Sequence, residues 1–242
     1  MREERIGGAT LYLGDCREHL PGYKSGHTII FDPPYGIAHT SNYVGPTTTA
    51  AWMNRKIAND DSLAIRDFVL SSHCGAWAAF ATIKMPPPAV YRGCIVWDKG
   101  PSAGMGDLAF PWKPSWELIY LGGPGWSGAR DEGVQRFVSV SRASMGRTHP
   151  NEKPVPLLRH LIQKAPAGTI CDPTMGTGAT GVAAILEGRP FVGIEFDEGY
   201  FSVAVERIMA AQRQRDLFID APPPEDPADA RLRDLFAEPG AA

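Results

Sequence analysis

The sequence contains no long hydrophobic run, which excludes proteins built on membrane-spanning helices. No stretch of its 242 residues approaches the roughly 18 to 20 consecutive apolar residues that are needed to cross a bilayer. Residues 1–5 are charged and no apolar segment follows them, so a secretory signal peptide is not expected. With 43% hydrophobic and 21% charged residues, the composition is that of an ordinary globular chain. We therefore expect a cytoplasmic protein.

Cysteine is scarce, and its spacing argues against stabilisation of a domain by disulfides or by a zinc ion. The four cysteines are far apart and form no Cys-x-x-Cys pair, so neither a disulfide framework nor a zinc site is expected. We expect all of them to be reduced residues of the hydrophobic core, namely Cys16, Cys74, Cys94 and Cys171.

Net charge is also small and unevenly placed. The formal charge of −3 comes entirely from residues 212–242, where seven acidic residues accompany four arginines. Within the remaining chain, residues 122–164 carry an excess of four positive charges. Such a segment suits contact with phosphate, although a solvated surface explains the charge as well.

Apolar runs bounded by glycine, proline and aspartate alternate with segments of helical periodicity. This alternation predicts an α/β fold with a mostly parallel sheet and helices on both faces. A change to Pro-rich, acidic composition favours one domain over residues 1–211 and a flexible tail over 212–242. Strands are expected at 10–13, 28–31, 77–81, 94–97, 117–121, 169–171 and 191–194, and helices at 62–72, 154–164, 179–187 and 199–212.

An acid, two prolines and an aromatic residue follow the strand expected at 28–31. These are Asp32, Pro33, Pro34 and Tyr35. The prolines remove two backbone donors and leave carbonyls free to accept. A carboxylate beside a free carbonyl can accept both hydrogens of a planar exocyclic amine, while the tyrosine ring offers a stacking face. The motif indicates a pocket for an amino-bearing base, although a strand followed by a rigid turn would also explain it.

A second motif combines glycines with an acid. A strand at 169–171 opens through Gly176 and Gly178 into a helix, and the next strand ends at Glu195, seventeen residues past Gly178. Glycines let the backbone approach a ligand closely, and the acid can hold ribose hydroxyls. This order is typical of a nucleoside-cofactor site. A nicotinamide or flavin oxidoreductase would suit the glycines, but it leaves the motif at residues 32–35 unexplained.

Together the motifs resemble the DNA amino-methyltransferases that use S-adenosylmethionine, in the permuted class where Asp-Pro-Pro-Tyr precedes the glycines. The resemblance implies a Rossmann-like methyltransferase fold with a seven-stranded, mostly parallel sheet. It also implies a bacterial or bacteriophage enzyme that acts on DNA without a metal, as a monomer or homodimer. The blocks that carry it are 11–16, 32–35, 149–154, 172–180 and 193–195 with 200–207.

The resemblance also implies roles for single residues. Asp32 and the Pro33 carbonyl would accept the amine hydrogens of a flipped base, which stacks on Tyr35. Thr174 stands where the family usually has phenylalanine, so the apolar contact falls to Met175 or another residue. Alternatively, Lys153 is an ordinary solvated cation and His149 an ordinary loop histidine. The implied cofactor-binding residues are Asp15, His149, Lys153, Asp172, Thr174, Gly176, Thr177, Gly178 and Glu195.

The aspartate of the first motif favours adenine N6 as the methylated atom, and cytosine N4 is the alternative. Target recognition is expected from a short insertion at 122–148 and from a loop at 36–59, with short or relaxed sequence specificity. Both segments could equally be surface loops. The candidate DNA-binding residues are Arg130, Arg136, Arg142, Arg147, Tyr43, Arg55 and Lys56.

Two further features remain. Most of the aromatic group Trp97, Phe110, Trp112 and Trp116 is expected in the core, with Trp97 and Lys99 lining the base pocket. The peptide 214–218 (Gln-Arg-Asp-Leu-Phe) resembles the segment by which bacterial replication proteins dock on the sliding clamp; alternatively it folds back onto the domain. A non-catalytic DNA-binding module is the third functional alternative.

Overall fold

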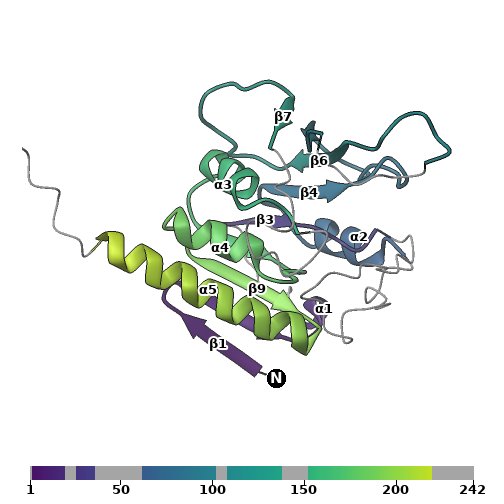
Figure 1. Ribbon diagram of the computed structural model, residues 1–242. Helices are drawn as coiled ribbons and strands as arrows, with labels where there is room; N and C mark the ends of the chain where they lie inside the picture. The colour runs from purple at the N-terminus through teal and green to yellow at the C-terminus, as the bar shows by residue number, and fades with distance from the viewer. Residues whose placement is uncertain (1, 20–25, 36–61, 102–107, 138–151, 220–242) are drawn as a thin grey trace, which may run out of the picture.

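The computed structural model describes residues 2–19, 26–35, 62–101, 108–137 and 152–219. These residues form one mixed sheet between two layers of helices (Figure 1). In the described part the sheet has nine strands, in the order β1-β2-β9-β8-β3-β4-β6-β5-β7. The strands are β1 (Arg2–Ile6), β2 (Ala9–Leu13), β3 (His27–Phe31), β4 (Trp77–Ala81), β5 (Gly93–Asp98), β6 (Trp116–Gly122), β7 (Val134–Arg136), β8 (Thr169–Asp172) and β9 (Phe191–Glu195).

The centre of the sheet is parallel, and its margins are partly antiparallel. Strands β2, β9, β8, β3 and β4 run in one direction. Strand β6 lies antiparallel between β4 and β5, and β1 lies antiparallel to β2. The helices are α1 (Cys16–His19), α2 (Ala64–Ser71), α3 (Val155–Lys164), α4 (Ala179–Leu186) and α5 (Glu198–Ile219). No helix in these described ranges is both long and apolar enough to cross a membrane.

The two-residue period of the strands divides the core into two halves. In β3, Ile30 packs in the cluster with α3, α4 and α5, whereas Ile29 and Phe31 pack in the cluster with α2. In β4, Phe80 packs in the first of these clusters and Trp77 in the second. Because both faces are covered, every residue of β4 is buried, as expected for a central strand.

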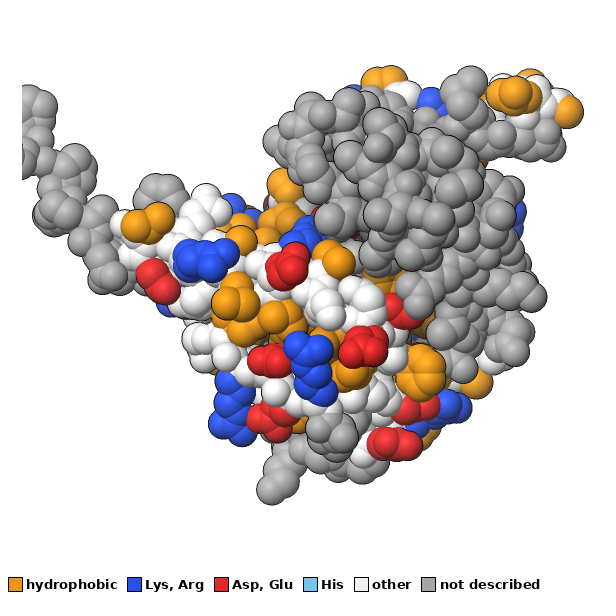
Figure 2. All heavy atoms as spheres, turned by 60° about the horizontal axis from the view of Figure 1, so that its bottom comes forward, with side chains coloured by type: hydrophobic (Ala, Val, Ile, Leu, Met, Phe, Trp, Pro, Cys, Tyr) orange, Lys and Arg blue, Asp and Glu red, His pale blue; other side chains and the backbone are white. Residues whose placement is uncertain are grey.

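The expected order of strands and helices is present, but the strand count was wrong: nine strands are found instead of seven. The additional strands lie at the two edges of the sheet, where no continuous apolar pattern is required. The sequence of β1 is Arg-Glu-Glu-Arg-Ile, and ion pairs link Arg2 to Glu4 and Arg5 to Glu3. Acidic, basic and hydrophobic side chains are interspersed on this face of the molecule (Figure 2).

Two smaller expectations also need correction. Helix α5 was expected to end at residue 212, but it continues to Ile219, since arginine, glutamine and leucine favour helix. The first residues of the expected tail are therefore helical, and 220–242 lie outside the described residues. Cys16 and Cys171 are buried as expected, whereas Cys74 and Cys94 are exposed.

Candidate functional site

The parallel strands β3, β8 and β9 end at the same edge of the sheet, which we call the carboxyl edge. Strand β3 pairs with β8, and β8 pairs with β9. This pairing brings Asp32, Asp172 and Glu195 to one edge, although they are far apart in the sequence. The antiparallel strand β6 begins at this edge, with Glu117 as its second residue, and β5 ends there just before Lys99. Ligand sites of open α/β sheets form at such an edge.

Four side chains of alternating charge form a continuous chain at this edge, in the order Asp32, Lys153, Glu117, Lys99. Lys153 Nζ lies 2.9 Å from Asp32 Oδ2 and 3.0 Å from Glu117 Oε2. Lys99 Nζ donates to the other oxygen of Glu117. The four formal charges cancel, and each charged group has a partner of opposite sign. Such pairing is needed because an unpaired charge that is shielded from water destabilises the folded protein. We refer to these four residues as the charged chain.

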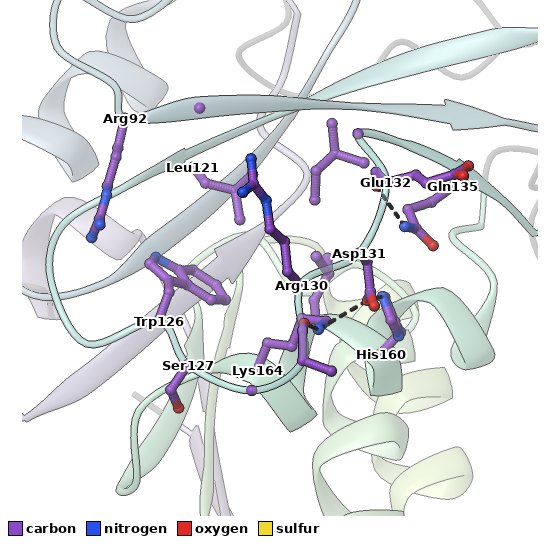
Figure 3. Close-up of a pocket in the computed structure, with 16 residues that line it drawn as sticks. Arg92, Leu121, Trp126, Ser127, Arg130, Asp131, Glu132, Gln135, His160 and Lys164 are labelled. Atoms are coloured by element: carbon purple, nitrogen blue, oxygen red, sulfur yellow. Dashed lines mark hydrogen bonds and ion pairs between the residues drawn. The ribbon is translucent and has the colours of Figure 1, made fainter.

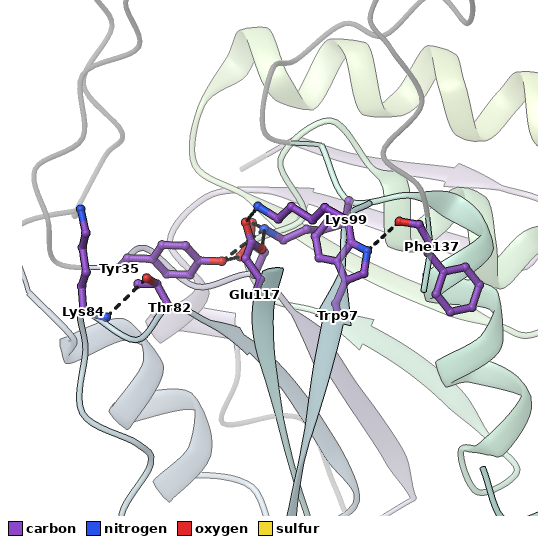
Figure 4. Close-up of polar contacts among 9 residues, drawn as sticks. Tyr35, Thr82, Lys84, Trp97, Lys99, Glu117 and Phe137 are labelled. Carbon is purple, nitrogen blue, oxygen red and sulfur yellow. Dashed lines mark hydrogen bonds and ion pairs between the residues drawn. The ribbon is translucent and has the colours of Figure 1, made fainter. Parts of the chain in front are cut away.

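Tyr35 completes the environment of Asp32. Its hydroxyl donates to Asp32 Oδ1 over 2.5 Å and accepts from Lys153 Nζ over 3.2 Å. The phenol points toward Glu117 and Lys99, with Trp97 on the opposite side (Figure 4). The Asp32 side chain keeps 34% of its surface exposed, so a substrate can still reach the carboxylate.

The pKa values of the charged chain reflect burial opposed by pairing. Burial raises the pKa of Asp32, and the Lys153 ammonium partly offsets that rise. Burial acts to lower the pKa of Lys153, but Asp32 and Glu117 outweigh it and hold the pKa well above its ordinary value. Burial acts to raise the pKa of Glu117, but Lys153 and Lys99 outweigh it and lower the pKa. Lys153 and Glu117 are therefore charged at neutral pH.

Aromatic rings surround the Lys153 ammonium. Its Nζ lies 5.0 Å from the ring centroid of Phe80, 5.6 Å from that of Tyr35 and 5.9 Å from that of Trp97. Trp97 is fixed in turn, because its indole Nε1 donates to the Phe137 carbonyl over 2.8 Å. A cation among aromatic faces is stabilised electrostatically. Trp97 is itself only 3% exposed and belongs to the core, so its place at a base pocket stays a prediction.

The glycine loop between β8 and α4 forms the neighbouring part of the site. Gly176 and Gly178 both have positive φ, and a Cβ at Gly176 would meet no atom of the described residues within 4 Å. Glu195 accepts from the Gly176 amide over 2.9 Å and from the Asp197 amide over 2.7 Å. The loop is therefore open beside Gly176 but packed against α5 at Gly178, where a Cβ would meet Ala204, and the Gly176 amide binds Glu195.

Asp172 and Glu195, the two acids of this loop region, have strongly raised pKa values. Burial raises the pKa of Asp172 to about 7. Burial likewise raises the pKa of Glu195 to about 7, and hydrogen bonds from backbone amides only partly offset it. Strongly shifted pKa values in a polar cleft are typical of functional sites.

Thr174 and Arg207 connect the glycine loop to its surroundings. The Thr174 hydroxyl donates to the Asp32 carbonyl over 3.2 Å, and the Thr174 amide donates to Asp172 over 3.1 Å. Arg207 of α5 donates to the Thr177 carbonyl over 2.7 Å and pairs with Glu152. Thr174 thus joins the two sequence motifs directly, at the position where it departs from the family pattern.

The other predicted cofactor residues have different surroundings. Asp15 follows β2, which pairs with β9, so it lies at the same edge as Glu195, and its carboxylate binds Arg17. Met175 is 4% exposed and packs under Gly193 in the core, so it is not available for the apolar contact expected of it. Phe196, beside Glu195, is 60% exposed and offers an apolar surface there instead. His149 lies outside the described residues.

Arg130 and Arg136, predicted together as DNA contacts, lie at opposite ends of β5. Arg136 pairs with Asp98 over 2.7 Å at the carboxyl edge. Arg130 lines a cavity of about 400 Å³ near the start of β5, together with Arg92 and Trp126 (Figure 3). The predicted residues Arg142, Arg147, Tyr43, Arg55 and Lys56 lie outside the described residues.

Two further expectations concern exposure. Phe110, Trp112 and Trp116 are 59%, 71% and 40% exposed, so the expectation that they belong to the core was wrong. The clamp-like peptide at 214–218 lies in α5, where Leu217 is 73% exposed. Binding of a sliding clamp stays a prediction.

Sequence reasoning missed Glu117 and Arg207. Glu117 is an acid at the start of a strand that is otherwise apolar, and this isolated charge was the available signal. Arg207 ends the block 200–207 that carries the family resemblance, and this position was the available signal. Within the described part of the chain, no three His, Cys, Asp or Glu side chains are grouped as for a metal ion.

Comparison with known proteins gives one family-model match, two similar proteins and a set of similar solved structures. Residues 94–206 match the family model described as DNA methylase. The chain is 43% identical to the methylase YubD of Escherichia coli K12 over 72 residues, which are 29% of this chain and 32% of YubD. It is 37% identical to the DNA adenine methyltransferase YhdJ of the same organism over 65 residues, 26% of this chain and 22% of YhdJ. The matched stretches thus span at most 32% of these relatives.

Solved structures share the fold at low identity. The M1.HpyAVI complex with SAM aligns with a TM-score of 0.59 and 17% identity, covering 83% of this chain and 98% of that one. The cytosine-N4-specific PvuII DNA methyltransferase aligns with a TM-score of 0.60 and 13% identity, covering 90% and 94%. These matches confirm the Rossmann-like methyltransferase fold and the predicted resemblance to S-adenosylmethionine-dependent DNA amino-methyltransferases.

Proposed function

We propose that this chain, whose sequence over residues 94–206 matches the DNA methylase family, transfers a methyl group from S-adenosylmethionine to an exocyclic amine of a DNA base. The observation that carries the proposal is the junction of the two motifs. Thr174 of the glycine loop donates to the carbonyl of Asp32, so the cofactor loop and the amine-binding carboxylate are adjacent.

The glycine loop fits the cofactor. Open space beside Gly176 leaves room for the methionine part, and Asp172 is held directly behind that loop. Glu195, which accepts from the Gly176 amide, would hold the ribose hydroxyls, and the exposed ring of Phe196 would contact the adenine. When bound, S-adenosylmethionine supplies a methyl group whose bond to sulfur breaks, with both electrons remaining on sulfur, as the amine nitrogen forms its new bond.

Asp32 and Pro33 orient the amine. The carboxylate of Asp32 and the carbonyl of Pro33 accept its two hydrogens, which localises the nitrogen lone pair for in-line attack. In the described part of the chain, no hydrogen bond occupies the Pro33 carbonyl. Lys153 and Tyr35 hold the Asp32 carboxylate in place from the other side.

The amine loses one proton once its nitrogen carries the new methyl group, and Asp32 is positioned to accept it. Burial raises the pKa of Asp32, which favours acceptance of a proton, while the Lys153 ammonium keeps the carboxylate ionised beforehand. Tyr35 has a pKa raised well above its ordinary value by burial, so it remains a donor. No covalent enzyme intermediate is required.

We favour adenine N6 as the acceptor, because the first motif begins with aspartate. The cytosine-N4 alternative stays open, since named relatives include an adenine methyltransferase and a cytosine-N4-specific one. A base within a duplex cannot reach Asp32, so it must be flipped out, with the Tyr35 ring as the stacking face.

The experiment is transfer of labelled methyl from S-adenosylmethionine to unmethylated DNA, followed by nucleoside analysis of the digest. N6-methyladenine supports the main proposal and N4-methylcytosine selects the alternative. The Asp32→Ala variant should lose turnover while it retains cofactor binding by calorimetry. Normal turnover of that variant, or absence of cofactor binding by the wild type, would overturn the assignment.

A further inference from the structure

The loop that joins β5 and β6 leaves the sheet at the carboxyl edge, directly beside the charged chain. Its base is closed by the pairing of Asp98 with Trp116 and by a hydrogen bond from the Lys99 amide to the Ser115 carbonyl, 2.8 Å long. Lys99 and Glu117, which flank this base, belong to the charged chain. The segment 108–116, which is the described part of the loop before β6 together with the first residue of β6, is called the aromatic loop below.

The aromatic loop exposes large apolar side chains to solvent. Leu108, Phe110, Trp112 and Trp116 are 79%, 59%, 71% and 40% exposed. The rings of Phe110 and Trp112 are packed together, with centroids 5.5 Å apart. In Figure 1 the loop extends beyond the end of β4 at upper right, and hydrophobic side chains occupy the projecting lobe at upper right of Figure 2. Single exposed apolar residues are ordinary, but a projecting cluster of this kind marks an interaction site.

The backbone of the aromatic loop is stiffened. Pro111 separates Phe110 from Trp112, and Pro114 lies between Trp112 and Trp116. Each proline fixes one φ angle, which lowers the conformational entropy that the loop loses on binding. Lys113 Nζ donates to the Pro101 carbonyl over 2.7 Å and ties the loop to its own base. The rings are therefore displayed in advance of binding.

The charge around the aromatic loop suits a polyanion. Residues 108–116 contain Lys113 and no acid. Lys84, in the loop after β4, and Arg136, paired to Asp98, are exposed at the same edge. The acids Asp32 and Glu117 are neutralised within the charged chain. Exposed aromatics interleaved with cations are characteristic of nucleic-acid contacts.

We propose that Phe110 and Trp112 of the aromatic loop insert against the bases that flank the flipped nucleotide in duplex DNA. This inference rests on the proposed function and names the surface that opens the duplex. Extraction of a base leaves its neighbours without a stacking partner, and apolar side chains inserted at a base step offset that loss. Because the loop begins and ends beside the charged chain, its rings reach the duplex where the extracted base enters the site.

The test compares the double variant Phe110→Ala/Trp112→Ala with the wild type. The matched control is Val90→Ala/Leu217→Ala, which truncates side chains that are 81% and 73% exposed but lie in other parts of the molecule. Affinity for a labelled unmethylated duplex, methyl transfer to native and to heat-denatured DNA, and binding of S-adenosylmethionine are measured for each protein.

We expect the double variant to lose at least about tenfold in duplex affinity and in methylation of native DNA. The loss should be smaller on denatured DNA, where the bases are already unpaired, and cofactor binding should match the wild type. The control should behave as the wild type does. Equal duplex affinity and methylation for the double variant and the wild type would overturn the inference. It would also be overturned if analytical sedimentation showed that the double variant loses only the ability to self-associate. Absence of methyl transfer by the wild type would instead overturn the proposed function.

Discussion

Lys153 Nζ lies 2.9 Å from Asp32 Oδ2, although the two residues come from opposite halves of the chain. Lys153 lies two residues before α3, which leads into β8, and β8 pairs with β3, the strand that Asp32 follows. The same ammonium also contacts Glu117. Sequence reasoning assigned Lys153 to the cofactor, whereas the structure places it on the carboxylate that we propose to hold the amine.

Replacement of Lys153 by methionine should slow methyl transfer by about a hundredfold, because the charge that holds Asp32 ionised is removed. Without that cation the pKa of Asp32 rises further, so the pH dependence of the rate should shift to higher pH. Steady-state rates between pH 6 and 9 measure both effects. Lys164→Met, at the other end of α3, is the control and should leave the profile unchanged.

The Glu117→Gln variant should be less stable than the wild type by about 1 to 3 kcal/mol. Its side chain is only 18% exposed and neutralises Lys99 and Lys153; without its charge Lys99 loses its carboxylate partner and Lys153 keeps only Asp32. Urea unfolding measures the difference. Glu187→Gln removes the charge of a side chain that is 15% exposed. Because its partner Arg159 is more exposed, this variant should lose less stability. Equal losses in the two variants would contradict the special place of Glu117.

Thr174→Val should reduce the methyl-transfer rate several-fold with little change in cofactor affinity. The hydroxyl bond to the Asp32 carbonyl is lost, whereas the backbone bond to Asp172 remains. The residue is a positioning residue, so rapid-quench rates are compared with calorimetric cofactor binding. If rate and affinity fell in parallel, the hydroxyl would serve the glycine loop as a whole.

The contribution of Asp172 and Glu195 to the stability of the cofactor-free protein should fall as pH rises from about 4 to 7. Burial raises the pKa values of Asp172 and Glu195 to about 7 from 3.8 and 4.5, so the folded state holds protons that the unfolded chain has released. Each group then contributes a decrease in unfolding free energy of up to roughly 1.4 kcal/mol per pH unit within that window.

The measurement is urea unfolding of the wild type and Glu195→Gln at pH 5 and pH 7.5. The variant should lose less stability between the two pH values, since its amide does not titrate. An identical pH dependence in both proteins would show that Glu195 is not protonated in the folded state at pH 5. Glu206→Gln, which replaces an exposed acid of α5, is the control.

The sequence alone predicted the fold class, both motifs and most element boundaries. Apolar runs that must be buried and glycines that adopt positive φ can be recognised from a few neighbouring residues in the sequence. It did not predict the edge strands, because an edge strand needs no continuous apolar pattern, as the sequence of Arg2–Ile6 illustrates. It also did not predict that Phe110 and Trp112 are exposed, because composition does not distinguish a core ring from a surface ring.

Only the tertiary structure decided which charges meet. Asp32, Lys153, Glu117 and Lys99 come from four separate segments, and the order and direction of the strands bring them together. The same strand directions separated Arg130 from Arg136, which are close in sequence. Local patterns determine what each segment becomes, whereas long-range strand pairing determines which side chains can neutralise one another and form a site.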